Sequence, residues 1–285
     1  MSKSSILKDQ IDFVALLEVN DANPNGDPLN GNRPRTSYDG YGELSDVCIK
    51  HKIRNRLMDM GYTVFYQGDD KRVDDYGSLS ERYRGMADLT EVMTKDERYA
   101  EACEIWDDIR LFGAVLAFKA NEKSKDESVT FGVTGAVSIR LAKSVAPVDI
   151  TSMQITKSVN NEPGEKKGSD TMGMKHYINH GLYVLKGSVS PIQAKRNGVT
   201  EEDVDHLKEA LSTLYVGDAT AARPEGSQRV VQLYWFRHDG IGSAYKTHSA
   251  VKVSLKDGIV VPTSFADYSV EYTPVKGVHC DVIDL

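Results

Sequence analysis

Residues 11–19 read IDFVALLEV, an almost unbroken apolar run with the length of a β-strand. A strand that is apolar at nearly every position is typical of a sheet interior that is covered on both faces. The following residues, 20–44, are rich in Asn, Pro, Gly and Asp, which excludes a helix and is long for a connection inside a compact domain. We therefore expect a central strand followed by a functional loop.

Residues 45–61 predict the first helix. Ser45 suits the N-cap position, Asp46 suits the first turn, and Gly61 suits the end. Between them, apolar residues recur at helical spacing at Ile49, Ile53, Leu57 and Met60. At 100° per residue, Lys50 and Arg54 fall on one flank of this apolar stripe, and Lys52 and Arg56 fall on the other.

The remaining pattern predicts an α+β fold. Strands are expected at 129–141, 181–190 and 228–236, with a weaker strand at 248–255, and Thr200 caps a helix that runs to Leu214. Residues 81–118 predict an acidic helical insertion, and residues 150–177 predict a long protruding hairpin. Without these insertions the order is strand, helix, strand, strand, helix, strand, which is that of a ferredoxin-like fold and of the RNA recognition motif.

Composition is that of an ordinary globular protein: 285 residues, 40% hydrophobic and 27% charged, which excludes disorder, collagen and coiled coil. No apolar run approaches the ~18 residues needed to cross a bilayer, and the polar start lacks the centre of a signal peptide. We expect a cytoplasmic protein without a membrane partner. The chain has three cysteines, Cys48, Cys103 and Cys280, which are far apart and show no CxxC spacing. Neither a disulfide framework nor a cysteine zinc site is therefore supported, and we expect buried free thiols.

The net charge is −7, but basic and acidic residues are concentrated in different segments of the chain. Residues 32–56 hold six Lys or Arg against three acids, and residues 139–197 hold nine against four. Acidic residues concentrate between Val73 and Asp108 and after Ser254. This separation favours a basic surface that contacts the phosphates of a nucleic acid without reading its sequence.

Several local patterns are similar to metal or catalytic sites. Residues 21–27 resemble the start of a calcium-binding loop in the spacing of their oxygen ligands. However, Asn32 occupies the position that requires a bidentate Glu, and Pro24 and Pro28 interrupt the turn. A loop stiffened by proline, or a polar loop that presents Asn and Arg side chains to a ligand, remain the alternatives.

The spacing of His176 and His180 resembles a zinc pair, but no Glu follows His176 and Gly181 breaks any helix, so structural histidines are favoured. No phosphate-binding or nucleophile motif occurs. Asp21, Asp27 and Asp39 could serve acid–base chemistry, although their spacing gives no reason to pair them.

Five segments together resemble the CRISPR-associated protein seven family. They are NPNGDP at 23–28, GNRPR at 31–35, GELSDVCIKHKIRN at 42–55, DIRLFGAVLAF at 108–118 and FGVTGAVSIR at 131–140. The resemblance runs from about residue 10 to about residue 240, and the nearest relatives look like the backbone subunit of the type I-C surveillance complex, Cascade.

This resemblance implies a hand-shaped protein with a ferredoxin-like, RNA-recognition-motif palm. The palm would comprise residues 1–64, 126–149 and 178–285, the helical fingers 65–125, and the thumb hairpin 150–177. Copies would stack along one CRISPR RNA, and each thumb would displace a base so that the guide pairs with a target DNA strand. Implied partners are neighbouring copies, the guide-end-capping or processing subunit, the large and small subunits, and a helicase-nuclease recruited by the whole complex.

The family positions that hold the guide backbone fall on Ser45, Lys50 and Arg54 of the first helix. The further RNA-binding candidates are Asn23, Asn25, Arg33, Arg35 and Lys52, with Lys157, Lys166 and Lys167 of the thumb. Met172 or Met174 would be the apolar wedge beside a displaced base. No cofactor, metal or catalytic residue is expected.

Two alternatives remain open beside this non-catalytic function. Related backbone subunits of type III effectors cut target RNA with a metal and an acid in the loop after the first strand, where Asp21 or Asp27 stands. An ordinary monomeric RNA-recognition-motif protein would instead form no filament on its RNA and would have no long thumb.

Overall fold

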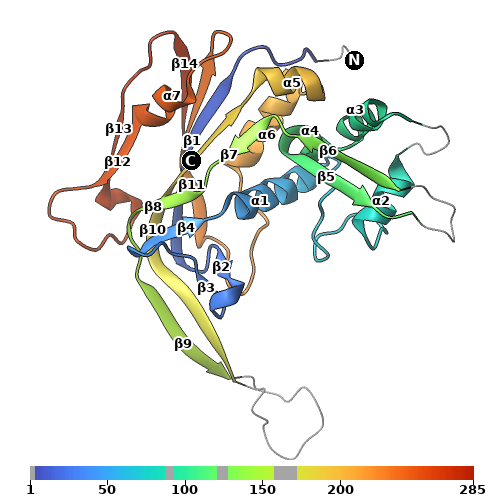
Figure 1. Cartoon of the computed structure of the whole chain (residues 1–285). Coiled ribbons are helices and arrows are strands. Elements are labelled where there is room, and N and C mark those ends of the chain that lie inside the picture. Colours follow the sequence, from blue (N-terminus) through green and yellow to red (C-terminus); the bar gives the residue numbers. More distant parts are fainter. Residues whose placement is uncertain (1–3, 88–92, 121–127, 157–171) are drawn as a thin grey trace, which may run out of the picture.

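The computed structural model describes residues 4–87, 93–120, 128–156 and 172–285. Its centre is an antiparallel sheet whose strands are β1 (Ile11–Ala22), β4 (Tyr41–Leu44), β7 (Val137–Ile139), β8 (Ala142–Pro147), β9 (Ile150–Thr156), β10 (Met172–Val189), β11 (Gln228–His238) and β14 (Val278–Asp284). They lie in the order β14–β11–β1–β10–β8–β4, and β7 and β9 also pair with β10. Figure 1 shows that one hairpin and one helical part project from this sheet.

The central position of β1 is confirmed. It pairs antiparallel with β10 on one side and with β11 on the other, and residues 11–19 are all buried. Because side chains alternate along a strand, Phe13 and Leu17 enter one core while Val14 and Leu16 enter a second core on the opposite face. Two covered faces explain why this strand has no polar alternation.

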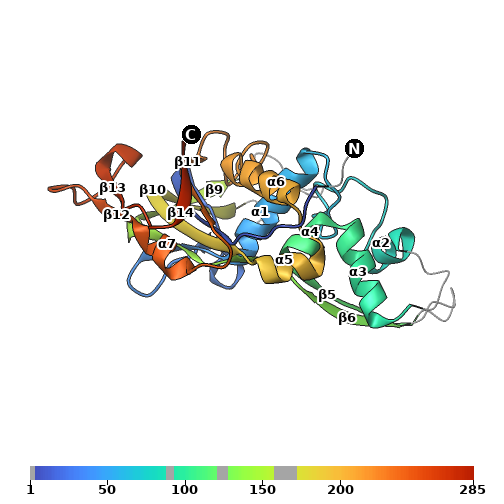
Figure 2. The ribbon, with the colours of Figure 1, turned by 90° about the horizontal axis from the view of Figure 1, so that it is seen from above.

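Two helices cover one face of the sheet, α1 (Asp46–Asp59) and α6 (Glu201–Ser212), as Figure 2 shows. Both begin as predicted, since Ser45 Oγ accepts a hydrogen bond from Cys48 N and Thr200 caps α6. The other face is covered by β12 (Val251–Leu255) and β13 (Tyr268–Tyr272). No helix in the described ranges is both long and apolar enough to span a membrane.

The expected order of six elements is present as β1, α1, β7 with β8, β10, α6 and β11. The strands among them lie in the order β11–β1–β10–β8. Two expectations were wrong in detail. The strand expected at 129–141 is two strands separated at Gly135, where any Cβ would lie 2.2 Å from the backbone of Phe112. The strand expected at 248–255 begins only at Val251, because residues 244–250 form α7 (Ala244–Ala250).

The fingers comprise α2 (Leu79–Met86), α3 (Lys95–Ile105), α4 (Asp107–Phe112), β5 (Gly113–Phe118) and β6 (Val129–Thr134) around a core of their own that includes Tyr83 and Trp106. The helical expectation for 81–118 was wrong in its last residues, because Gly113, at a φ of 78°, ends α4 and the chain continues as β5. β5 pairs with β6. The boundary expected at 125 lies outside the described residues, and β6 beyond it belongs to the fingers core.

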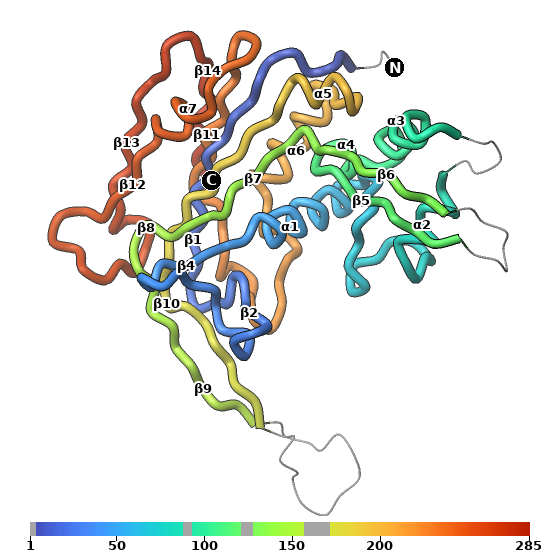
Figure 3. The backbone as a smooth tube through the Cα atoms, in the orientation of Figure 1, coloured from blue at the N-terminus to red at the C-terminus, as the bar shows by residue number. Residues whose placement is uncertain are grey.

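We call β9 and the first part of β10, Met172–Ile178, the thumb. These two segments pair antiparallel, as expected for the arms of a hairpin, and residues 157–171 between them lie outside the described residues. Figure 3 shows both arms leaving the sheet beyond β4 and β8. β10 then continues into the palm, so that the strand expected at 181–190 is the second half of one 18-residue strand. Several elements were not predicted, among them β4, β8, β13, β14, the helix α7 and the short helix α5 (Pro191–Asn197).

Candidate nucleic-acid interface

The loop between β1 and α1 is ordered by its own polar residues. It contains β2 (Gly26–Asp27), the 3-10 turn η1 (Pro28–Asn30) and β3 (Arg33–Pro34). Asn25 Oδ1 accepts a hydrogen bond of 2.9 Å from the backbone N–H of Ser45, and so ties the loop to the start of α1. Arg35, which follows β3, lies 3.3 Å from Asp27 of β2. Asn25 and Ser45 therefore shape the interface rather than extend from it.

Asn23 lies beneath this loop and is 4% exposed. Its Nδ2 donates to the carbonyl of Asn32 at 2.6 Å, and its backbone N–H donates to the carbonyl of Ala222 at 2.9 Å. Its Oδ1 has no hydrogen-bond partner among the described residues. A buried acceptor without a partner costs about 1–3 kcal/mol.

The cations of α1 contact other parts of the protein. Arg54 Nε donates to Asp108 Oδ2 at 2.7 Å, and its guanidinium lies 4.9 Å from the Tyr66 ring centre. Arg56 Nε donates to Thr213 Oγ1 at 2.7 Å. Arg54 thus fastens α1 to the fingers and Arg56 fastens it to the end of α6.

Lys52 is the most deeply buried of these cations, at 4% exposure. It forms an ion pair with Asp218 and lies 5.2 Å from the centre of the Tyr215 ring. Burial lowers the pKa of Lys52, against the opposing charge of Asp218. Lys50 differs, because its pair with Asp46 at 3.0 Å lies on the outer side of α1 and leaves the side chain 23% exposed. Of the four cations, Lys50 is therefore the one best placed to exchange its carboxylate for a phosphate.

The thumb presents apolar side chains. Met172 and Met174 are 61% and 56% exposed, which is unusual for methionine in a folded protein. In the β9–β10 register, Met174 lies opposite Gln154 and His176 lies opposite Ser152, so these four residues share one face of the hairpin. Lys157, Lys166 and Lys167 lie outside the described residues.

One chain of hydrogen bonds joins the loop to this face of the thumb. Arg33 Nη1 donates to Ser152 Oγ at 2.7 Å, and Ser152 Oγ lies 2.8 Å from His176 Nδ1. Arg33 was expected to contact phosphate, but one of its N–H groups donates a hydrogen bond to the thumb. The sequence interpretation gave His176 no role in binding, and its spacing carries no signal for this contact.

A groove of about 180 Å³, the thumb-base groove, lies where these parts meet. Its lining residues come from the loop, the thumb and the segment before β11: Asn23, Gly31, Asn32, Ile155, Met174, Lys175, His176, Ala221 and Ala222. Two sequence-predicted residues, Asn23 and Met174, therefore lie together, although 151 positions separate them in the chain. Sequence reasoning missed Lys175, His176 and the two alanines.

The acids of the loop do not converge. Asp27 contacts Arg35 and the N–H of Leu29, and Asp39 is paired with Ser37 and Lys143. His176 and His180 lie on one strand, where a spacing of four residues corresponds to roughly 13 Å. Across the described ranges, no group of three or more His, Cys, Asp or Glu is arranged to hold a metal ion.

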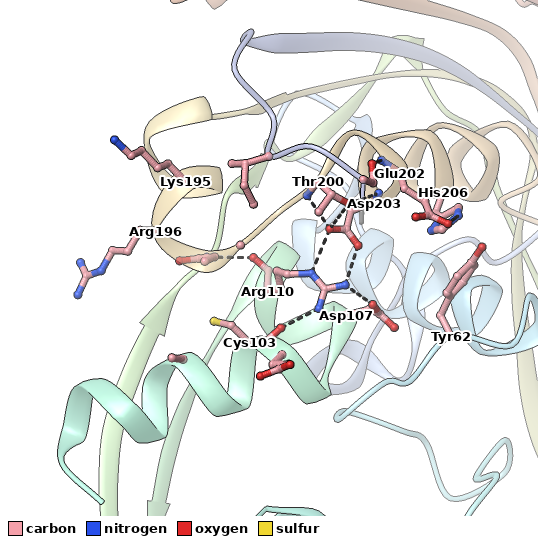
Figure 4. A pocket seen from close by; sticks show the side chains of 16 residues that line it. Tyr62, Cys103, Asp107, Arg110, Lys195, Arg196, Thr200, Glu202, Asp203 and His206 are labelled. Carbon is pink, nitrogen blue, oxygen red and sulfur yellow. Dashed lines mark hydrogen bonds and ion pairs between the residues drawn. The ribbon is translucent and has the colours of Figure 1, made fainter. Parts of the chain in front are cut away.

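A second cavity, of about 790 Å³, lies between the fingers and helices α5 and α6 (Figure 4). At its centre Arg110 is bound by Asp203 at 2.6 Å, by Asp107 and by the carbonyl of Cys103 at 2.7 Å. Burial raises the pKa of the Cys103 thiol to about 11, which keeps it protonated at neutral pH. Because its central cation is fully engaged, this cavity is best explained as the joint between fingers and palm.

Comparison with known proteins agrees with this architecture. A chain described as "CRISPR RNA-guided surveillance complex, pre-nicking" has a TM-score of 0.52 and 14% identity, covering 88% of this chain and 84% of that chain, and this likeness concerns the fold alone. The CRISPR-associated protein Cas7 of Haloferax volcanii is 26% identical over 208 residues, which cover 69% of this chain and 61% of that relative. The family model for CRISPR-associated protein Cas7 matches residues 9–273, and the chain therefore belongs to the Cas7 family.

Proposed function

We propose that this protein is the repeated backbone subunit of a type I-C surveillance complex and binds its CRISPR RNA guide. The observation that carries the proposal is the family match over residues 9–273. The strand order β11–β1–β10–β8 with α1 and α6 on one face supports a ferredoxin-like palm of the RNA-recognition-motif kind.

The guide would lie across the loop and the face of the thumb that carries Met174 and His176. Exposed methionines can insert between stacked bases, and the few kcal/mol lost per unstacked step would be offset by contacts to the backbone of the guide. Lys50, Arg35 and the thumb lysines would supply these contacts. Holding the guide by shape and backbone leaves base pairing to read the target DNA strand.

A backbone subunit acts through its partners. We propose neighbouring copies of this chain, the guide-end-capping or processing subunit, and the large and small subunits as partners in the cytoplasm, with a helicase-nuclease recruited by the assembled complex. The subunit itself would be non-catalytic. Incubating the complex with complementary RNA and Mg²⁺ tests this, because cuts at regular spacing would show an endoribonuclease.

The decisive experiment is expression of the protein with its CRISPR array. We expect the purified material to be a large particle that contains one RNA species of guide length, seen on a denaturing gel and in the ratio of absorbance at 260 and 280 nm. An RNA-free monomer would contradict the proposal. A one-to-one complex on a long guide would instead favour an ordinary RNA-recognition-motif protein.

A further inference from the structure

Three Asn-Gly pairs occur in the chain, at residues 25–26, 30–31 and 197–198. Asparagine is among the chemically labile residues, and it is most labile before glycine, because a residue without a side chain leaves its backbone nitrogen open to approach. That nitrogen can attack the side-chain amide carbon of the asparagine. The three pairs differ in how firmly the amide is held and in how much room surrounds the glycine.

The third pair is locked between the fingers and the palm. Asn197 is 3% exposed, and its Oδ1 accepts a hydrogen bond from the Tyr99 hydroxyl. Its Nδ2 donates to the carbonyls of Arg110 and Thr134 at 3.0 and 2.8 Å. The amide carbon can meet the next backbone nitrogen only after these three hydrogen bonds have broken, so the native fold protects this residue.

The first pair is held less firmly. Asn25 Oδ1 accepts the hydrogen bond from the backbone N–H of Ser45, and Gly26 pairs with Pro34 between β2 and β3. A Cβ on Gly26 would lie 2.0 Å from Asn32 Oδ1, so this glycine is closely packed. Rotation of the Asn25 amide toward the Gly26 nitrogen therefore requires the loss of one hydrogen bond and a change in strand pairing.

The second pair lies open in the turn between β2 and β3. Asn30 and Gly31 are both exposed, and the Asn30 side chain has no hydrogen-bond partner among the described residues. Gly31 has a φ of 59°, and a Cβ placed on it would meet nothing within 4 Å. Asn30 ends η1, a single 3-10 turn, and such turns have poorer hydrogen bonds than an α-helix and open locally. This short turn is the main restraint that keeps the amide carbon from the Gly31 nitrogen.

We propose that Asn30 is a site of spontaneous deamidation, and that the product weakens the binding of RNA by this loop. The Gly31 nitrogen loses its proton to hydroxide and forms a bond to Asn30 Cγ, while the Cγ–Nδ2 bond breaks and ammonia leaves. Water then opens the resulting five-membered imide at either carbonyl and leaves aspartate or isoaspartate. The net change converts one amide and one water into a carboxylate and an ammonium ion.

The product changes the loop in two ways. The new carboxylate adds a negative charge three residues before Arg33, and isoaspartate lengthens the backbone by one atom before Gly31. Gly31 and Asn32 line the thumb-base groove, and the Asn32 carbonyl accepts the hydrogen bond from Asn23, so a longer backbone displaces part of the candidate interface. Both changes oppose the binding of a polyanion. This consequence rests on the proposed RNA-binding function, whereas the reaction does not.

The experiment incubates the purified full chain at physiological temperature and measures, by peptide mass spectrometry, how much of each asparagine becomes acid. Asn30 should react first, with Asn25 about tenfold and Asn197 about 100-fold slower, since one and three hydrogen bonds must break there. The rate at Asn30 should rise with pH, because the attacking nitrogen must lose its proton. Asn30→Gln is the matched control, because it keeps an exposed amide but must close a larger ring, and it should accumulate no acid at this position.

The effect on binding is measured by fluorescence anisotropy with a labelled single-stranded RNA, before and after incubation. Wild-type protein in which Asn30 has reacted should bind about threefold more weakly than fresh protein. Asn30→Gln should keep its affinity through the same incubation. Fresh Asn30→Asp supplies the charge without the longer backbone, and should lose affinity but less than protein that contains isoaspartate.

The remaining outcomes separate the site from its effect. Equal rates at the three asparagines, or no acid at Asn30, would overturn the assignment of the site. The same loss of affinity in incubated wild type and incubated Asn30→Gln would overturn the effect on RNA binding. Fresh wild-type protein that bound no RNA would refute the proposed function and this effect with it, while the reaction at Asn30 would still be decided by mass spectrometry.

Discussion

Replacing Arg54 with Ala should destabilise the protein instead of removing a surface contact to RNA. The Arg54 side chain is 13% exposed and its partner Asp108 is fully buried, with 2.7 Å between Nε and Oδ2. Without the guanidinium, the Asp108 carboxylate would retain the backbone N–H groups of Phe65 and Tyr66, at 2.7 and 3.2 Å. Two neutral donors compensate a buried charge only in part.

The size of the effect follows from this geometry. Removing one partner of a buried ion pair lowers the free energy of unfolding by about 3–5 kcal/mol. Because two N–H donors remain on the Asp108 carboxylate, we expect Arg54→Ala to cost about 3 kcal/mol, at the lower end of this range. In a chain of this length that corresponds to a fall of roughly 6–10 °C in the unfolding midpoint. Lys50→Ala on the same helix breaks only a half-exposed i,i+4 pair, and should cost no more than about 0.5 kcal/mol.

The assay is thermal and urea unfolding of both variants, together with RNA affinity at a temperature where both are folded. We expect Arg54→Ala to lose stability and Lys50→Ala to lose affinity. The structural explanation of Arg54 would be refuted by wild-type stability combined with a loss of RNA binding like that of Lys50→Ala. Asp108→Asn provides a second test, because its destabilisation and that of Arg54→Ala should be strongly non-additive in the double variant.

Three further predictions concern single residues. Lys50→Ala should weaken binding of unrelated guide sequences by the same factor and reduce the slope of log K against log salt by about one, measured by titration at several salt concentrations; unequal losses between guides would contradict a backbone contact. Met174→Ala should lower RNA affinity about tenfold, whereas Met153→Ala, on the other face of the thumb, should not; equal losses would argue against a base wedge. The hydrogen bonds from Arg82 hold the pKa of Asp74 below its usual value of 3.8, so this carboxylate stabilises the fold above about pH 4 and its contribution is lost as the pH falls through the lowered pKa. Asp74→Asn should therefore flatten the dependence of the free energy of unfolding on pH below pH 4, and a urea series at pH 5 and pH 3 that matched the wild type would disprove the role of this pair.

Elements with strong local signals could be predicted from the sequence. β1 is marked by its apolar run, and α1 and α6 are marked by an N-cap followed by helical spacing. β5 could not be distinguished from a continued helix, because GAVLAF is short and apolar and its strand state depends on pairing with β6. Of the three free cysteines, Cys103 is buried as expected, while Cys48 and Cys280 are only half-buried.

The candidate site was predictable only in part. The loop and the thumb were identified, but what joins them depends on pairs distant in the chain. Arg33 and Ser152 are 119 residues apart, and Arg54 and Asp108 are 54 apart. A helical wheel places Arg54 on a flank of α1, but it contains no information about which carboxylate faces that flank.

Long-range pairing also changes what the basic character of residues 32–56 means. Six cations in this segment form hydrogen bonds or ion pairs within the protein: Arg33, Arg35, Lys50, Lys52, Arg54 and Arg56. The pairs of Arg35 and Lys50 are partly exposed, cost little to break, and can exchange a carboxylate for a phosphate. The buried pair of Arg54 cannot do so without leaving the Asp108 carboxylate without a cation, whereas Asp218, the partner of Lys52, also lies 3.7 Å from Arg223.

Half of the cations of this segment, Lys52, Arg54 and Arg56, therefore hold α1 against the fingers and against the end of α6 and the residues that follow it. In the proposed function, few charged contacts to RNA therefore remain. They lie around the loop, next to the apolar thumb and the thumb-base groove. On that proposal, such a protein would gain more of its affinity for RNA from shape and base contact than from charge, which is consistent with its net charge of −7.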